Sequence, residues 1–186
     1  MSQHNDTAPV ELIDIYDSEK KRTGEIIPRR GDLGDGFRLV VQICIFSGDR
    51  LLIQRRSSTK KSFPRLWDMS AAGQVDEGET SCEGAKREVF EELALEYDIT
   101  EKDLFVTHCL PHTFNDVYIL DYNGSEITIQ ESEVEEYRWA TLVEILDLMR
   151  NGEFIPYKPM LIKSVFEAHR SGIRNVPNIH MDSSYI

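Results

Sequence analysis

Three glutamates within five residues, Glu88, Glu91 and Glu92, have the types and spacing in this chain that most directly suggest chemistry. Their i, i+3, i+4 spacing places three carboxylates on one side of a helix, within an arc of roughly 100°. Such like charges repel one another, and they lie too far from the helix N-terminus for the helix dipole to stabilise them. A hard divalent cation relieves the repulsion, because Mg²⁺ takes carboxylate oxygens and keeps waters for a substrate phosphate. A solvated acidic face is the alternative that three glutamates alone leave open.

The residues around these glutamates predict the helix that positions them. Thr80 followed by Glu83 is a capping box, and Gly78 supplies a turn upstream, so the helix should begin near Thr80 or Ser81. Lys86 falls among apolar positions, and its side chain must bend outward to reach water. The face expected to be buried carries Cys82, Ala85, Val89, Phe90 and Leu93.

Length and charge limit the class of protein. A chain of 186 residues is long enough for one well-buried domain with extra elements at its ends. The net charge of −12 argues against a nucleic-acid polymer as the main partner, because phosphate-binding surfaces need a basic stripe. The longest apolar run, 39–46, is broken by Gln42 and is too short to span a bilayer. Residues 1–10 show no signal-peptide pattern. We therefore expect a cytoplasmic protein that has no membrane partner.

The three cysteines, Cys44, Cys82 and Cys109, show no CxxC spacing. Each lies in an apolar setting, two in expected strands and one on the core face of the helix. Buried, reduced thiols are expected, rather than a zinc site or a disulfide.

Apolar periodicity predicts alternating strands and helices, which suit a mixed sheet between helices. We expect a disordered segment over 1–10 and a single domain over 11–172, whose first part, 11–30, is a β-hairpin. An irregular tail should follow over 173–186. The predicted strands are 11–16, 25–27, 38–46, 50–55, 105–109, 116–122, 126–130 and 137–140, with Asn123-Gly124 as a hairpin turn, and the later helices are 141–150 and 159–169.

The stretch from Gly73 to Leu95 resembles the Nudix box: Gly, five residues, Glu, seven residues, Arg-Glu, an apolar residue, one more, Glu-Glu, one more, Gly and an apolar residue. The departure is Ala94, where the family usually has the glycine that ends the helix, so the tightness of that turn is in question. The corresponding positions are Gly73, Glu79, Arg87, Glu88, Val89, Glu91, Glu92, Ala94 and Leu95.

The resemblance implies a Nudix-type α/β/α sandwich with a mixed sheet, and a Mg²⁺-dependent hydrolase, with Mn²⁺ as the alternative metal. It supports Glu88 and Glu92 as the central metal ligands, with Glu91 adjoining. The backbone carbonyl near Ala72 or Gly73 is a further ligand in the family. Arg87 is expected to orient carboxylates, including Glu79, by bidentate pairing.

The general base is left open among glutamates outside the box. In the family it is often a Glu on a late loop or strand, and resemblance to related chains favours Glu133, then Glu131. Glu135 and Glu136 are the other candidates in the same acidic run. A surface glutamate is the alternative for each.

A narrower resemblance covers 51–74, which is similar to the isopentenyl-diphosphate isomerase branch of the fold. The positions of Arg56 and Lys60 contact the diphosphate in that branch, while Trp67 is expected to line the site or to pack in the core. The isomerase needs a cysteine where this chain has Ala72 and a metal-binding histidine where it has Gln74. Both are missing, and proton transfer to an alkene without its acid is hard to support.

We therefore predict a pyrophosphohydrolase that cleaves a nucleoside diphosphate linked to another moiety, or a similar small-molecule diphosphate. Isomerase-like activity and a non-catalytic nucleotide-binding regulator are the alternatives. The sequence leaves the substrate undefined, because fold does not determine specificity. A homodimer, formed through the N-terminal hairpin, is also left open.

Overall fold

The computed structural model describes residues 10–176. The disorder expected over 1–10 and the irregular tail expected over 173–186 therefore lie largely outside the described residues. Val10 and residues 173–176 have no regular secondary structure.

The main sheet is mixed. Its strands run in the order β5 (Trp67–Asp68), β4 (Arg50–Arg56), β3 (Arg38–Ser47), β8 (Thr113–Asp121) and β7 (Leu104–Leu110). Two further strands extend it, because β6 (Ala71–Gln74) pairs with β3, and β9 (Val134–Ala140) pairs with β4. The β3–β8 pair is parallel and the other pairs are antiparallel.

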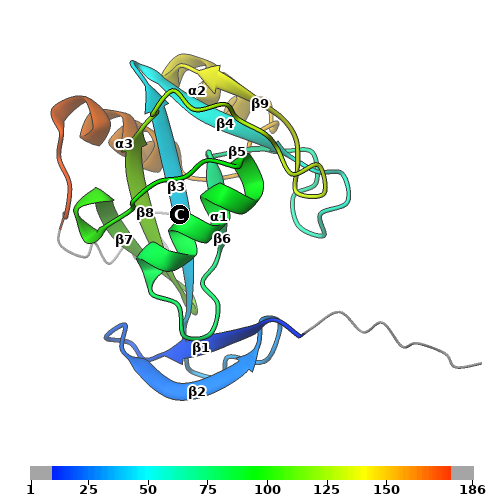
Figure 1. The fold of residues 1–186 in the computed structure, drawn as a ribbon, viewed down its shortest axis with the longest axis vertical. Coiled ribbons are helices and arrows are strands. Elements are labelled where there is room, and N and C mark those ends of the chain that lie inside the picture. Colours follow the sequence, from blue (N-terminus) through cyan, green and yellow to red (C-terminus); the bar gives the residue numbers. More distant parts are fainter. Residues whose placement is uncertain (1–9, 177–186) are drawn as a thin grey trace, which may run out of the picture.

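Helices cover both faces of this sheet. Helix α1 (Ser81–Leu93) lies across one face, and α2 (Leu142–Arg150) and α3 (Pro159–Ser171) lie on the other (Figure 1). Along β3, Ile43 and Ile45 pack on the α1 side, whereas Cys44 and Phe46 join the core beneath α2 and α3. This alternation follows the two-residue period of a strand that is buried on both faces. The predicted α/β/α sandwich is confirmed.

The N-terminal hairpin is also confirmed, as a separate two-stranded antiparallel sheet of β1 (Leu12–Tyr16) and β2 (Arg22–Pro28). Figure 1 shows it below the sandwich, beside the loop that leads into α1. Two hydrogen bonds join it to that loop: Glu77 N donates to Leu12 O at 2.9 Å, and Gly78 N donates to Asp14 Oδ2 at 2.9 Å. The hairpin is therefore attached to the segment that precedes the glutamates.

The start of α1 confirms the capping box. Thr80 is the N-cap, and Glu83 Oε2 accepts from Thr80 N at 2.7 Å. The predicted buried face is wrong at Phe90, whose side chain is 55% exposed. Glu88 and Glu92 are buried instead, so the helix is rotated to turn these two carboxylates toward the sheet. Lys86 bends outward as expected and pairs with Asp98 at 2.9 Å.

The strand predicted over 126–130 and the hairpin turn at Asn123-Gly124 are wrong. Residues 122–130 contain no strand. This segment instead runs past the C-terminal end of α1, where Thr128 N donates to Leu93 O at 3.0 Å and Gln130 N donates to Glu92 O at 3.2 Å. The last carbonyls of a helix lack partners within the helix, and here they take the amides that a hairpin would have used.

The helix predicted over 141–150 is confirmed as α2, capped by Thr141, and the one over 159–169 extends slightly further as α3. The three cysteines are free: Cys44 is buried, whereas Cys82 and Cys109 are only partly buried. Within residues 10–176 no helix is long and apolar enough to cross a membrane.

Candidate functional site

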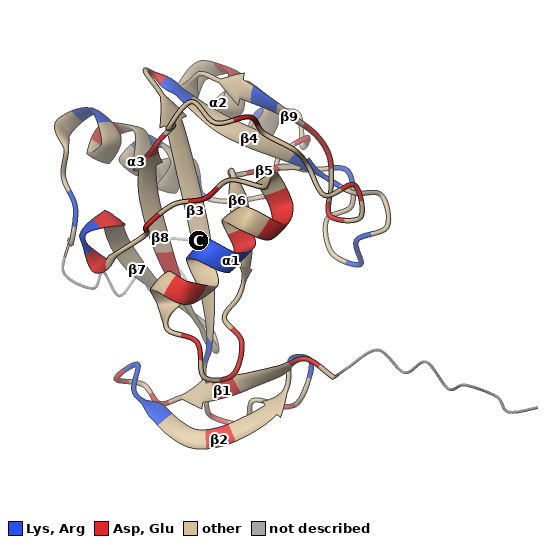
Figure 2. Ribbon diagram, viewed as in Figure 1, with Lys and Arg blue, Asp and Glu red and all other residues tan. Residues whose placement is uncertain are grey.

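A polar cavity of about 350 Å³ opens beside α1. Five parts of the fold form its wall: the ends of the hairpin, β6 with the loop after it, α1, the loop that contains Lys60, and the segment before β9. Figure 2 shows acidic and basic segments close together along α1. The lining residues are Glu11, Arg29, Lys60, Ala72, Gly73, Asp76, Arg87, Glu88, Glu91, Glu92, Gln130 and Glu133.

The close approach of β6 to α1 depends on Gly73. A Cβ at this position would lie 1.9 Å from Glu88 Cδ and 2.0 and 2.3 Å from the two carboxylate oxygens. Such separations are far below van der Waals contact, so only glycine leaves room for the Glu88 carboxylate against the strand. The glycine at the start of the motif is thus required by the position of the first glutamate of the acidic cluster.

Glu88 and Glu92 are buried carboxylates that lie close together. Burial, together with the neighbouring charge of Glu88, raises the pKa of Glu92 to about 8. Two neutral donors oppose this shift, because Glu92 Oε2 accepts from Gln54 Nε2 at 2.8 Å and from Ala72 N at 3.2 Å. Burial also raises the pKa of Glu88, and the charge of Arg87 works against it.

Arg87 ties the carboxylates of the motif together. Its Nε and Nη2 donate to the two oxygens of Glu79 at 2.8 and 2.9 Å, a bidentate pair. Its Nη1 donates to Glu88 at 2.7 Å and to Glu91 at 3.3 Å, and Nη2 also donates to Gln74 O at 3.0 Å. Arg87 therefore connects the loop before α1 with the acidic face of α1.

The donor set fits a hard divalent cation. Within residues 10–176 no three acidic, histidine or cysteine side chains already stand close enough to hold a metal ion. Glu92 is nevertheless 4% exposed and forms no ion pair with any described residue, so its charge lacks the partner that a buried carboxylate requires. Carboxylates and the Ala72 carbonyl are the oxygen ligands that Mg²⁺ prefers. Glu88 and Glu92 are buried and Glu91 is exposed beside them, and the three carboxylates match such an ion in chemistry.

Among the candidate bases, Glu133 is the one that lines the cavity. Its carboxylate pairs with Lys60 Nζ, and burial lowers the pKa of Lys60, with the charge of Arg56 adding to that effect. Glu135 accepts from Ser58 N at 2.8 Å, Glu136 pairs with Arg55 at 2.9 Å, and neither lines the cavity. Glu131 is exposed and does not line the cavity.

Two predicted substrate-binding residues lie outside this cavity lining. Arg56 Nη1 donates to the buried Asp68 at 3.3 Å. Trp67 is 8% exposed and packs in the core beneath α2 and α3, with Arg138 Cζ 4.7 Å from its ring centroid. Burial of the indole explains this placement, because a large aromatic side chain gains most from leaving water.

Sequence spacing did not indicate several lining residues. Glu11 and Arg29 come from the hairpin, Asp76 from the loop before α1, and Gln130 from the segment that contacts the end of α1. Of these residues, Asp76 could most readily have been predicted from the sequence, because it lies within the motif at 73–95. The others are brought to the cavity by tertiary packing.

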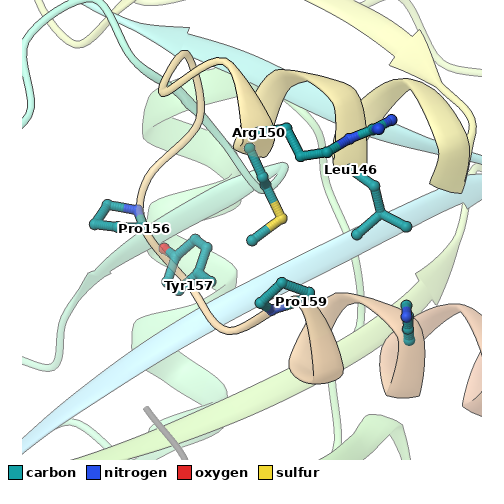
Figure 3. Close-up of a pocket in the computed structure, with 7 residues that line it drawn as sticks. Leu146, Arg150, Pro156, Tyr157 and Pro159 are labelled. Carbon is teal, nitrogen blue, oxygen red and sulfur yellow. The ribbon is translucent and has the colours of Figure 1, made fainter.

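A second hollow, of about 470 Å³, lies between α2 and α3 (Figure 3). Leu146, Met149, Pro156 and Pro159 supply most of its wall, with Arg150 and Lys163 as its charged residues. It contains no carboxylate and so offers no ligand set for a divalent cation. The polar cavity beside α1 is therefore the candidate site.

Comparisons with known proteins find relatives that match most of this chain. The NUDIX domain model matches residues 36–160. An uncharacterised Nudix hydrolase from Listeria monocytogenes is 34% identical over 171 residues, which is 90% of this chain and 97% of that protein. An isopentenyl-diphosphate Delta-isomerase from Photorhabdus laumondii is 26% identical over 148 residues, covering 76% of this chain and 81% of that one. A crystal structure from Deinococcus radiodurans matches with a TM-score of 0.68 at 25% identity, covering 83% of this chain and 99% of that one.

Proposed function

This chain belongs to the Nudix family, and from that premise we propose that it is a metal-dependent pyrophosphohydrolase. Its substrate would be a nucleoside diphosphate linked to another moiety, or a similar small-molecule diphosphate. The observation that carries the proposal is a pair of buried carboxylates on α1. Glu88 lies against Gly73, and Glu92 bonds to Gln54 and Ala72 N but pairs with no Lys or Arg among the described residues.

Each part of the site has a proposed role. Glu88, Glu92 and Glu91, with the carbonyl of Ala72, would hold Mg²⁺, or Mn²⁺ in its place. When bound, the ion would neutralise phosphate charge and lower the pKa of a bound water. Arg87 keeps the carboxylates of Glu88 and Glu79 in fixed orientations through its hydrogen bonds.

Proton transfer and substrate binding fall to residues outside the helix. Glu133 faces the cavity, and we propose that its carboxylate accepts the proton of the attacking water. Lys60 would contact a phosphate oxygen of the diphosphate, exchanging its pairing with Glu133 for the substrate. Arg56 is the second proposed phosphate contact, reached from the edge of the site beside Asp68. In this proposal the residues of α1 hold the metal ion, and Glu133 in the loop before β9 accepts the proton.

Isomerisation of a prenyl diphosphate is the second candidate, favoured by the identity with the isopentenyl-diphosphate isomerase. The chain carries Ala72 and Gln74 on β6, where that chemistry needs an acid and a metal-binding histidine. Neither an alanine methyl nor an amide can donate the proton that an alkene must receive. Hydrolysis is therefore the favoured proposal, ahead of the isomerase and of a non-catalytic nucleotide-binding regulator.

The remaining proposals concern organisation. We propose that residues 11–172 form one domain, that the protein acts in the cytoplasm on a small molecule, and that any homodimer forms through the N-terminal hairpin. Light scattering on the purified chain and on a hairpin-deleted chain would test the last of these.

The experiment that tests the function is a substrate panel. Nucleotide sugars, dinucleotide cofactors, nucleoside triphosphates and prenyl diphosphates would be incubated with the protein and Mg²⁺, and again with EDTA. We expect Mg²⁺-dependent cleavage at the diphosphate of at least one class, absent with EDTA. Isomerised prenyl diphosphate without hydrolysis would support the isomerase, and binding without turnover would support the regulator.

A further inference from the structure

The N-terminal hairpin supplies two side chains to the cavity wall, Glu11 and Arg29. Arg29 immediately follows β2, and its backbone N donates to Glu11 O at 2.8 Å. The hairpin is held against the loop before α1 by the Glu77 N to Leu12 O hydrogen bond. The position of Arg29 relative to the glutamates is therefore fixed by backbone contacts.

The Arg29 guanidinium is only partly satisfied by the protein. Nη2 donates to Asp76 Oδ1 at 2.7 Å, and Nη1 pairs with Glu11 Oε2 at 3.0 Å. The third nitrogen, Nε, is buried and has no partner, which holds for no other guanidinium nitrogen in residues 10–176. A buried donor without an acceptor is costly, so this N–H calls for an acceptor that none of residues 10–176 provides.

The other two cations of the cavity wall are engaged differently. Arg87 donates through all three of its nitrogens to carboxylates and a carbonyl of the motif. Lys60 pairs with Glu133. Arg29 therefore lines the cavity and retains a buried donor that no described residue satisfies, in a wall that also contains six carboxylates, Glu11, Asp76, Glu88, Glu91, Glu92 and Glu133. An anionic ligand entering such a cavity needs a cation on the side away from the carboxylate cluster of α1.

This inference rests on the proposed function and extends it. We propose that Arg29 is a substrate-binding residue, whose Nε–H donates to a phosphate oxygen of the diphosphate. The hairpin is then a wall of the substrate site as well as an appendage of the fold. Arg29 contributes binding and orientation, and it takes no part in proton transfer.

A purely structural role for Arg29 makes different predictions. If Arg29 served only to hold Asp76 and the loop before α1, its loss would disturb the helix and the metal site. The increase in Tm that Mg²⁺ gives the protein and the value of kcat would then both decrease. If it binds substrate, KM and ligand affinity change while stabilisation by Mg²⁺ alone is kept.

The test compares Arg29→Gln, Arg29→Lys and the neighbouring control Arg30→Gln in the full chain. Arg30 is exposed and does not line the cavity.

Three measurements separate the two roles. Calorimetric titration with methylenediphosphonate in Mg²⁺ measures ligand binding without turnover, and the thermal shift with Mg²⁺ alone measures metal binding. Kinetics on the hydrolysed substrate separate KM from kcat. Arg29→Gln should weaken methylenediphosphonate binding about 10- to 100-fold. Arg29→Lys should recover part of this affinity, because it keeps the charge and loses the planar fork.

Equal affinity of Arg29→Gln and the wild type for methylenediphosphonate, in a protein that does hydrolyse diphosphates, would overturn this inference and leave the proposed function standing. A parallel loss of Mg²⁺ stabilisation and kcat in Arg29→Gln would overturn it in favour of the structural role. A wild-type chain that neither binds methylenediphosphonate nor cleaves any diphosphate would overturn both.

Discussion

The Glu88 carboxylate occupies the space that a side chain at Gly73 would fill. The two residues are on different elements, β6 and α1, and a Cβ on Gly73 would lie 1.9 Å from Glu88 Cδ. The Gly73 backbone and the Glu88 carboxylate are therefore in direct contact. Because Gly73 has no side chain, the carboxylate of Glu88 can be buried between α1 and β6. Fourteen residues lie between the two positions in the chain, and packing brings them into contact.

Replacing Gly73 with alanine should displace the Glu88 carboxylate. We expect Gly73→Ala to lower Tm, to lose stabilisation by Mg²⁺ and to lose most hydrolysis. The control is the same change in a Glu88→Ala background, where the clash is gone and the decrease in Tm should largely disappear. Equal destabilisation by Gly73→Ala in both backgrounds would show that the contact does not matter.

Arg87→Lys should weaken the metal site while keeping the charge. A lysine cannot reproduce the bidentate pair with Glu79 together with the bond to Glu88, so the carboxylates lose their fixed orientation. Changes in such supporting partners typically cost about 10- to 100-fold in metal affinity or activity. Lys86→Gln is the matched control, since Lys86 pairs with the exposed Asp98 and should leave Mg²⁺ titrations unchanged. Similar Mg²⁺ affinity in Arg87→Lys and wild type would contradict the positioning role.

The metal-free protein should lose stability as pH rises, because of Glu92. Burial and the charge of Glu88 raise the pKa of Glu92 to about 8 in the folded state, above its ordinary value. Protonated Glu92 therefore favours the fold; its contribution is complete below the unfolded pKa and is lost as pH rises toward 8. In EDTA we expect the Tm of wild type to fall between pH 5 and pH 8 by more than that of Glu92→Gln, which has no proton to lose there. Identical profiles for the two proteins would exclude this linkage.

Ala94→Gly should stabilise the protein without changing its chemistry. Ala94 ends α1 in the left-handed conformation, with φ of 54°, and its N–H donates to Phe90 O. Glycine adopts this conformation without the strain of a Cβ, so the free energy of unfolding should rise by about 0.5–1 kcal/mol. Chemical denaturation measures the change, and kcat serves as the control. No gain, or a loss of stability, would show that the alanine turn carries little strain.

Local pattern accounts for the parts of this fold that were predicted correctly. The capping box at Thr80 and the apolar spacing of α2 and α3 lie within single elements, so spacing along the chain was sufficient. Phe90 was misplaced because it lies at the edge of the helical arc. There the strand beneath, rather than the hydropathy of the helix, decides which side chains are buried.

The failures at 122–130 and at the hairpin side of the cavity have one physical cause. The amides of Thr128 and Gln130 bond to the end of α1, and Arg29 reaches the site because its hairpin attaches to the loop before that helix. Both depend on elements distant in sequence. The carboxylates of Glu88 and Glu92 were found because they are neighbours on one helix, whereas the burial of both, and the contact of Glu92 with Gln54, became apparent only from the fold.

The most direct test of the account is the location of the metal. Crystals containing Mn²⁺ and methylenediphosphonate would be measured for anomalous scattering at the manganese edge. We predict a peak bound by carboxylate oxygens of Glu88 and Glu92 at roughly 2.0–2.3 Å, with the diphosphonate completing its coordination. Ordered diphosphonate and manganese elsewhere, with Glu88 and Glu92 free of metal, would contradict the central claim.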